Sequence, residues 1–290
     1  MKKISYLSAL LLVASFAFMA CSSDDDIHVE SVVVDRETYT LLAGDSIQLH
    51  AHVLPANADN QTIRWSSNNR AVATVDPNTG MVTAVSGGTV TITAASLDRW
   101  RTSTVVITVE FNISNSLSGV VVNDLRWATR NLAAPGVFAD SPTALGMLYQ
   151  WNRPTAWAAT GEHVIDWDTS IPEGATWMAE NDPCPAGWRI PTLAELESLH
   201  SAGGAWATYN DVNGRVFGTA PYQLFLPAVG WRLAYDGGAL VNADTDGAYW
   251  SSNTTDAAEI NAWTMRFNSS ELRMSNNARA NAFSIRCIAQ

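Results

Sequence analysis

Lysine is almost missing from this 290-residue chain, since Lys2 and Lys3 at the extreme N-terminus are its only lysines. Charged residues of all kinds make up only 16% of the chain, and its formal net charge is -11. Nucleic-acid binding requires a concentrated positive surface, and this acidic chain has no basic cluster. The composition therefore argues against a nucleic-acid partner.

Long hydrophobic runs are also scarce, and the one that stands out lies at the N-terminus. Lys2 and Lys3 precede an apolar run over 7–18, which is too short for a convincing membrane span but typical of a secretory signal. The run ends just before Cys21, as in a bacterial lipoprotein signal, which it resembles. We therefore predict a signal peptide over 1–20, lipidation of Cys21 and an acidic tether over 21–27. An ordinary signal peptide with an incidental cysteine is the alternative.

Hydrophobic residues are plentiful, at 47%, and tryptophan is unusually frequent, with twelve in the chain. All but Trp65 and Trp100 lie beyond residue 120. A chain of this length can form two domains, and the uneven tryptophan distribution indicates two different kinds of core.

The first domain, over 28–110, is predicted to be an all-β sandwich. The stretches 46–53 and 89–94 alternate apolar and polar residues, and Asp76–Gly80 has the composition of a hairpin loop. The run IRWSSNNRAVATVDPNTGMVTAVSGGTVTITA resembles the bacterial immunoglobulin-like domain, group 2. That resemblance implies a spacer or adhesive module without catalytic residues, followed by a linker over 111–117.

The second domain, over 118–290, has its clearest local signals in Pro183–Gly204. Thr192 and Glu195 have the spacing of a capping box, and three leucines at helical spacing follow before Gly203 and Gly204 end the helix. A second helix is expected around Leu145–Trp151, and a strand over 284–288. The rest of the domain is expected to be loop-rich with brief strands.

Two cysteines remain if Cys21 carries lipid. In an exported chain this even remainder predicts a disulfide between Cys184 and Cys287, with two free buried thiols as the alternative.

Five segments of this domain occur in the order found in the Fibrobacter succinogenes major paralogous domain: NDLRWATRNLAA, TWMAENDPCPAGWRIPTLAELESL, LFLPAVGWR, GAYWSSN and FSIRCI. This resemblance implies a C-type-lectin-like α+β fold, related to the formylglycine-generating enzyme superfamily, with a twisted antiparallel sheet and long ligand-presenting loops.

Catalysis is not expected. The formylglycine-generating enzymes use a pair of late cysteines, whereas this domain has Cys287 alone late in the chain. His163 and His200 are too few for the histidine triad of the related iron enzymes, and no nucleophile elbow or phosphate-binding glycine loop is present.

No metal site and no cofactor are predicted, with a calcium ion left open. The stretches Asn210–Gly214 and Asp244–Gly247 offer oxygen ligands, but neither has the twelve-residue loop with its closing glutamate. Ordinary Asx turns explain both stretches better.

The C-terminal stretch between Trp250 and Phe283 is the predicted ligand-binding face. It combines asparagine and serine, which hydrogen-bond adaptably, with tryptophan and arginine, which are common in binding loops. A hairpin with solvated turns is the alternative. The predicted contact residues are Asn253, Asn261, Trp263, Arg266, Asn268, Arg273, Asn276, Asn277 and Arg279.

Together these features predict a non-enzymatic lipoprotein, anchored in the outer membrane and exposed at the cell surface. An immunoglobulin-like spacer would present a C-type-lectin-like head to a glycan or a surface protein, for adhesion or ligand binding. The alternatives are a structural component of a surface polymer and a divergent enzyme of the formylglycine-generating superfamily.

Overall fold

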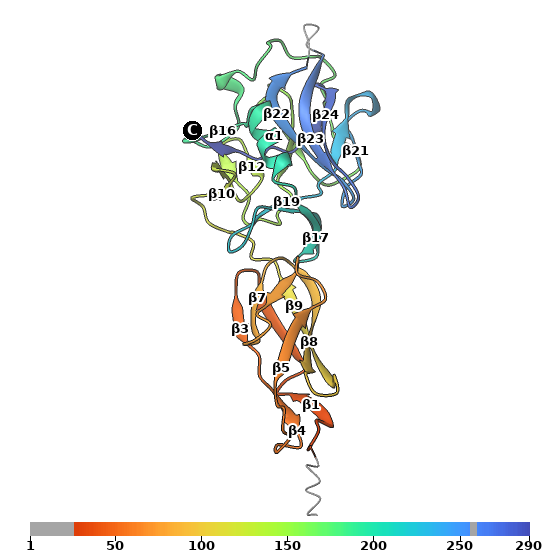
Figure 1. Ribbon diagram of the computed structural model, residues 1–290. Coiled ribbons are helices and arrows are strands. Elements are labelled where there is room, and N and C mark those ends of the chain that lie inside the picture. The colour runs from red at the N-terminus through yellow and green to blue at the C-terminus, as the bar shows by residue number, and fades with distance from the viewer. Residues whose placement is uncertain (1–25, 256–259) are drawn as a thin grey trace, which may run out of the picture.

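The computed structural model describes residues 26–255 and 260–290, arranged as two bodies joined end to end (Figure 1). The predicted signal peptide over 1–20, the lipidation site Cys21 and most of the tether over 21–27 lie outside the described residues.

The first body is a small β-sandwich of antiparallel and parallel strand pairs. Its largest sheet has the order β2-β9-β8-β5, the second has the order β3-β7-β6, and β1 pairs with β4. The strands are β1 (Ser31–Val34), β2 (Thr38–Leu42), β3 (Ser46–Gln48), β4 (Ala51–Leu54), β5 (Ile63–Ser67), β6 (Ala73–Val75), β7 (Met81–Ala84), β8 (Gly88–Ser96) and β9 (Thr102–Glu110).

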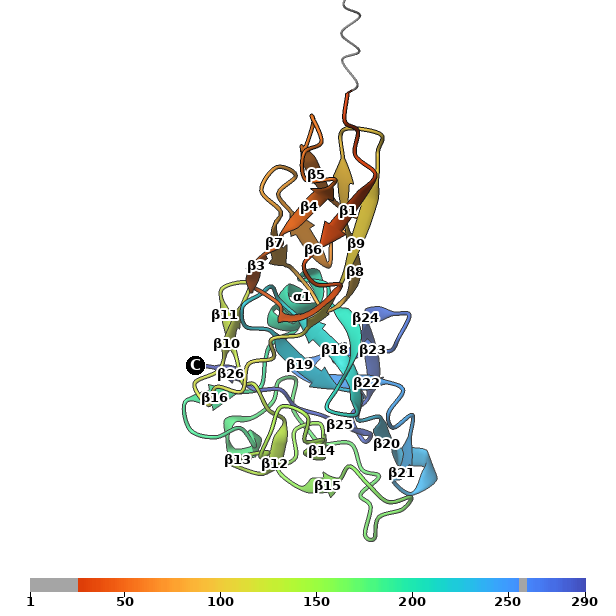
Figure 2. The same ribbon diagram turned by 90° about the horizontal axis from the view of Figure 1, so that it is seen from below.

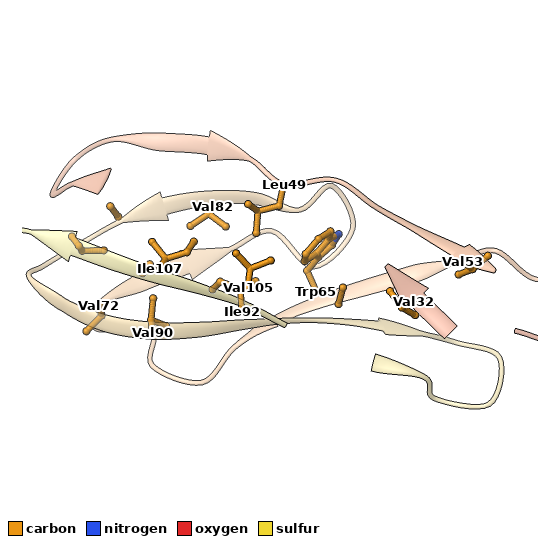
Figure 3. Packing of buried hydrophobic residues seen from close by; sticks show 14 of the residues in the cluster. Val32, Leu49, Val53, Trp65, Val72, Val82, Val90, Ile92, Val105 and Ile107 are labelled. Carbon is orange, nitrogen blue, oxygen red and sulfur yellow. The ribbon is translucent and has the colours of Figure 1, made fainter. Parts of the chain in front are cut away.

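The core of the sandwich comes from the inward residues of these alternating strands. Leu49 and Val82 pack with Trp65, Ile92 and Ile107 in one cluster of buried residues (Figure 3). The predicted alternation over 46–53 is present in the burial pattern, but the chain changes sheet between β3 and β4.

The segment between the two bodies is not a free tether. Ile113 forms a parallel bridge with Gln223 of the second body, whose backbone N–H donates to the Asn112 carbonyl at 3.0 Å. Ser114 N–H donates to the Gln223 carbonyl at 2.8 Å. On the other side, Ala220 packs against the sandwich core. The connection is therefore fixed by backbone pairing as well as by packing.

The second body, called the head below, is mostly β. The orders of its larger sheets are β10-β11-β26-β16, β15-β14-β25-β20-β21, β17-β18-β19 and β22-β23-β24, and β12 pairs with β13 (Figure 2). Its strands are β10 (Val120–Val122), β11 (Leu125–Trp127), β12 (Leu132–Ala134), β13 (Val137–Phe138), β14 (Met147–Gln150), β15 (Ala156–Ala158), β16 (Trp188–Arg189), β17 (Ala205–Tyr209), β18 (Val212–Phe217), β19 (Leu224–Pro227), β20 (Trp231–Leu233), β21 (Ala239–Val241), β22 (Gly247–Thr254), β23 (Asn261–Phe267), β24 (Leu272–Ala278), β25 (Ala282–Phe283) and β26 (Ile288–Ala289).

Within the described residues the head has one α-helix, α1 (Leu193–Ser201), and two short 3-10 helices, Ala179–Asn181 and Ala234–Asp236. The head is thus a mostly β structure, and its assignment to an α+β C-type-lectin-like class stays a prediction. The predicted helix around Leu145–Trp151 is wrong. This segment is the strand β14, which pairs with both β15 and β25 and is buried at Leu148, Tyr149 and Gln150.

The predicted strand over 284–288 is interrupted. Only β25 and β26 are strands, because between them Ser284 exchanges backbone hydrogen bonds with the outer side of β22 and Arg286 turns into the core. The disulfide predicted between Cys184 and Cys287 is present. It joins the turn before β16 to the residue before β26, and Cys287 is fully buried.

Three arginines, Arg232, Arg279 and Arg286, are fully buried in the head. Arg232 donates to the carbonyls of Ala158, Thr160 and Gly161 and to that of Gly238, at 2.6 to 3.0 Å. Arg286 donates to Asn131 Oδ1 at 2.7 Å and to the Ala128 carbonyl at 3.2 Å.

Burial lowers the pKa of Arg286 to about 10, so this side chain remains charged at neutral pH. Backbone carbonyls of loops, together with the Asn131 side-chain oxygen, therefore solvate these cations, and each arginine fastens the segment that it contacts.

Candidate functional site

The predicted ligand-binding face falls on the antiparallel sheet β22-β23-β24. Helix α1 covers part of one face of this sheet, where Leu196 and Leu199 pack with Tyr249, Met265 and Phe267. We call this the helix face and the other side the arginine face. Because strand side chains alternate between faces, the predicted contact residues separate onto both of them.

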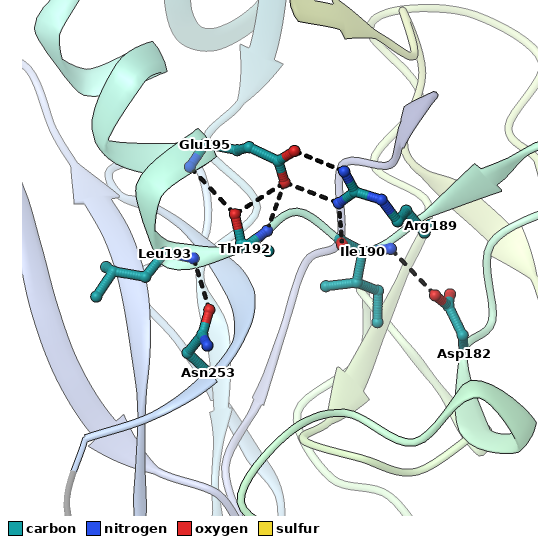
Figure 4. A network of polar contacts seen from close by, with 7 residues as sticks. All are labelled: Asp182, Arg189, Ile190, Thr192, Leu193, Glu195 and Asn253. Carbon is teal, nitrogen blue, oxygen red and sulfur yellow. Dashed lines mark hydrogen bonds and ion pairs between the residues drawn. The ribbon is translucent and has the colours of Figure 1, made fainter. Parts of the chain in front are cut away.

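The N-terminus of α1 is held by a network of polar contacts (Figure 4). Thr192 and Glu195 form the predicted capping box. The Arg189 guanidinium donates to both carboxylate oxygens of Glu195, at 2.6 and 2.8 Å. Burial raises the pKa of Glu195, but the hydrogen bonds from Arg189 and Thr192 outweigh it and the net pKa is lowered.

Asn253, one of the predicted contact residues, belongs to this network. Its Oδ1 atom accepts a hydrogen bond from the Leu193 backbone N–H at 2.8 Å. This bond satisfies one of the donors that a helix leaves free in its first turn. Asn253 thus anchors the helix to β22 while remaining partly exposed.

Trp263 is the most distinctive residue on the helix face. It is half-buried and belongs to none of the hydrophobic clusters found in the described part of the chain. Asn276 lies directly opposite on β24, and Asn261 precedes Trp263 by two positions on the same face of β23. We call Asn253, Asn261, Trp263 and Asn276 the Trp263 surface. An indole flanked by amides on rigid strands can stack on an apolar ligand face while hydrogen-bonding its rim.

The arginine face carries three other predicted residues, Arg266, Arg273 and Asn277. The Arg266 guanidinium lies 4.0 Å from the ring centre of Trp231. Burial lowers the pKa of Arg266, and its cross-strand neighbour Arg273 lowers it further.

The polar groups on the arginine face also have partners. Arg273 pairs with Glu271 at 3.1 Å, and Asn277 donates to Thr264 Oγ1 at 2.7 Å. This face is therefore largely satisfied by contacts within the head.

Asn268 and Arg279 lie outside both faces. Asn268 Oδ1 accepts the backbone N–H groups of Ser270 and Glu271, so it shapes the turn between β23 and β24. Arg279 is fully buried, stacks on Trp151 at 4.1 Å and donates to the carbonyls of Pro172 and Glu173. Arg279 therefore fastens a loop to the core and is not available to a ligand at the surface.

A groove lies beside the disulfide, and no pattern in the sequence predicted it. A cavity of about 430 Å³ is lined by residues that include Trp177, Trp188, Asp182, Arg189 and Cys184. Burial raises the pKa of Asp182, whose carboxylate accepts the backbone N–H groups of Cys184 and Ile190 at 2.9 and 3.1 Å. The polar groups of this groove thus mainly hold the turn before α1.

No cluster of three or more histidine, cysteine or acidic side chains suited to a metal ion occurs in residues 26–255 and 260–290. His50 and His52 are both exposed, on the strand side that faces away from the sandwich core. Asn210 and Asp211 form a two-residue hairpin turn with positive φ angles between β17 and β18. Within the same described ranges, no helix has the length and apolar character needed to cross a membrane.

Comparison with protein families gives two matches. Residues 28–109 match the bacterial Ig-like domain (group 2), and residues 206–288 match a domain of unknown function (DUF8237). The second match includes the sheet β22-β23-β24. The predicted likeness of the head to the Fibrobacter succinogenes major paralogous domain stays a prediction.

Two named proteins are similar to part of this chain. An Ig-like virion protein of Serratia phage KSP90 is 38% identical over 81 residues, which are 28% of this chain and 31% of that protein. A 3-O-alpha-D-galactosyl-alpha-L-arabinofuranosidase of Bifidobacterium longum subsp. longum is 40% identical over 91 residues, which are 31% of this chain and 8% of the enzyme. The chain thus spans less than a third of either relative.

Solved structures match only weakly overall. Domains 4 and 5 of the S-layer protein SbsC align with 28% of this chain and 51% of that structure, at 21% identity and a TM-score of 0.25. Drosophila N-cadherin EC1-4 aligns with 89% of this chain and 49% of that structure, at 9% identity and a TM-score of 0.26. The family match alone therefore identifies the first body, which is a bacterial Ig-like domain of group 2.

Proposed function

We propose that this protein is a surface-exposed lipoprotein, anchored in the outer membrane through Cys21, that binds a glycan or a protein through its head. The Ig-like domain acts as a spacer, and the head is C-type-lectin-like and non-enzymatic. Support for a cell-surface role comes from the match of residues 28–109 to the bacterial Ig-like domain. Adhesion is the physiological outcome that this arrangement serves.

The observation that carries the binding proposal is the Trp263 surface. Trp263 is a partly exposed tryptophan outside the described hydrophobic clusters, set on a strand that pairs on both sides. Large aromatic side chains held on rigid elements are the residues that contribute most to binding energy at interfaces. The neighbouring amides suit hydroxyl-rich or peptide ligands, which need both donors and acceptors.

The connection between the Ig-like domain and the head supports the spacer role. Backbone hydrogen bonds of Asn112 and Ser114 with Gln223 hold the connecting segment against the head, and Ala220 of the head packs against the core of the Ig-like domain. A spacer that swings freely would lose orientation entropy when its head binds at a surface, whereas a fixed joint avoids this cost.

A glycan array with the full-length Cys21→Ser protein tests the binding proposal. The Trp263→Ala variant is expected to weaken binding to any retained glycan or protein ligand by about thirtyfold, as for an aromatic residue at the centre of an interface. Trp100→Ala is the matched control, because Trp100 is 70% exposed on the Ig-like domain. Equal binding by the full-length Cys21→Ser protein and its Trp263→Ala variant would remove the Trp263 surface from the proposal.

Lipid anchoring has its own test. Intact-mass analysis of the natural protein is expected to show a mature chain that carries acyl groups, and the Cys21→Ser variant is expected to lack them. An unchanged acyl mass in Cys21→Ser would contradict the anchor.

A further inference from the structure

The sheet of the Trp263 surface ends in an unpaired strand. In the order β22-β23-β24, strand β24 pairs with β23 alone (Figure 1). The opposite edge of the sheet is covered, since Tyr249 bridges to Ser284, Asn253 bridges to Thr176 and the Ser252 N–H donates to the Pro191 carbonyl. Only one edge of this sheet is therefore open among the described residues.

The register decides which backbone groups of β24 point outward. Asn268 N–H donates to the Glu271 carbonyl at one end of the hairpin, and Arg279 N–H donates to the Ile260 carbonyl at the other, both at 3.0 Å. Hydrogen-bonded pairs alternate along an antiparallel ladder. Between these ends, the backbone N–H and C=O groups of Arg273, Ser275 and Asn277 thus point toward β23.

The alternate residues of β24 direct their backbone groups outward, away from β23. At the centre of the strand these residues are Met274 and Asn276, and no backbone partner for either is found in the described chain. At the two ends, the Leu272 carbonyl contacts His200 Nε2 and the Ala278 carbonyl accepts the Asn281 N–H. The centre of β24 is therefore a row of free donors and acceptors.

Edge strands are usually protected by short length, proline, bulges or several charges. Strand β24 has seven residues, LRMSNNA, with an unbroken register against β23 and no proline. Its one charged side chain is Arg273, and Asn276 and Ala278 are exposed. This edge lacks the usual protection against pairing with another strand.

We infer that β24 pairs antiparallel with β24 of a second copy of this chain, across a two-fold axis at Ser275. In this register the central residues of the strand, Met274 and Asn276, meet those of the partner, because Ser275 is the midpoint of β24. Met274 and the partner's Asn276 exchange both of their backbone hydrogen bonds, and symmetry repeats the exchange. Arg273 lies opposite the partner's Asn277, so no like charges face each other.

This pairing joins the two sheets into one, with the helix faces of both copies on the same side, because the two-fold axis is perpendicular to the sheet. Each copy then presents its Trp263 surface in the same direction, which raises the avidity for a repetitive ligand. The inference does not depend on the proposed function, since the pairing uses the backbone of β24 and needs no ligand.

Disulfide trapping tests the axis in the full-length Cys21→Ser background. Directly opposed residues of a non-hydrogen-bonded antiparallel pair have Cα atoms about 4.5 Å apart, within reach of a disulfide. Ser275→Cys is expected to form a covalent dimer under mild oxidation. Arg273→Cys is the control, because that residue is distant from its own symmetry mate. A monomeric Ser275→Cys protein, or equal dimer from Arg273→Cys, would overturn the inferred register.

Sedimentation equilibrium tests the association without a cross-link. Asn277→Glu places a carboxylate opposite the partner's Arg273 on both sides of the axis and is expected to tighten the dimer about fivefold. The double variant Arg273→Glu/Asn277→Glu opposes like charges and is expected to weaken it. Asn276→Pro removes an outward N–H while sparing the β23 ladder, and is expected to yield monomer with an unchanged circular dichroism spectrum. A monomeric wild-type protein at all concentrations, or an Asn276→Pro dimer as stable as wild type, would refute the inference.

Discussion

The Cys184–Cys287 disulfide is expected to supply a large share of the stability of the head. The test replaces both cysteines with alanine in the Cys21→Ser background, which leaves no free thiol in either protein. The bridge connects residues separated by 103 positions, so in the unfolded chain it closes a loop that includes more than half of the head.

Closing a loop of this length removes conformational entropy from the unfolded state worth about 4.7 kcal/mol in the chain-entropy model. Cys287 is also fully buried in the cluster that contains Trp231 and Phe283, so the alanine leaves a small cavity. A typical domain has a free energy of unfolding of about 5 to 15 kcal/mol. The double variant should therefore lose a third or more of the stability of the head.

Urea unfolding monitored by tryptophan fluorescence measures this loss, because all tryptophans except Trp65 and Trp100 lie in the head. We expect the unfolding midpoint of the double variant to fall by more than 1 M, with a slope of about 1 to 3 kcal/mol per M. A loss below about 1 kcal/mol would refute the loop-closure reasoning. If the calorimetric transition of the Ig-like domain also shifted by the amount expected for the head, the effect of the disulfide would not be confined to the head.

Three further predictions concern polar contacts of the head. Arg232→Met is expected to destabilise the head by about 3 kcal/mol in urea unfolding, because several buried carbonyls lose their hydrogen-bond donor. Arg232→Lys should recover part of this loss. An Arg232→Met variant as stable as the wild type would contradict the role of Arg232 in solvating these carbonyls. Asn253→Ala should cost about 1 kcal/mol through the lost acceptor for the α1 N-terminus, whereas Asn261→Ala, its control, should cost little. Because the pKa of Glu195 is lowered from 4.5, its stabilisation is present above that value and is lost as the pH falls through the lower folded pKa. Glu195→Gln should therefore reduce stability by about 1 kcal/mol at pH 7 and flatten its decline below about pH 4.5, and an unaltered pH profile would contradict the role of the Arg189 pair.

Local sequence signals were sufficient where neighbouring residues carry the whole interaction. Thr192 and Glu195 lie three positions apart, and the capping box that they form needs no other part of the chain. The same is true of the alternation in β8 and of the hairpin loop Asp76–Gly80, where the Asp76 side chain accepts backbone N–H groups of the next residues. Strand β14 forms because it pairs with β15 on one edge and with β25 on the other. Neither partner is part of Leu145–Trp151, so the local pattern of that segment could not predict the strand.

The candidate site shows more clearly what local sequence signals cannot predict. The sequence identified a stretch rich in asparagine, arginine and tryptophan, but the period of two along strands distributed those residues over opposite faces. Arg279 was predicted to contact a ligand at the surface, yet it is buried, and the Glu173 carbonyl that accepts its hydrogen bond lies 106 positions away in the sequence.

The sequence by itself determined the Ig-like domain, the capped helix and the cysteine pair, because each depends on a local pattern or on counting. The tertiary structure decided which of the nine predicted contact residues share a surface, which of them fasten loops, and that β24 ends its sheet without a partner. These properties depend on strand order and on contacts between segments that are distant in the sequence. A local pattern of residues contains neither the strand order nor those contacts.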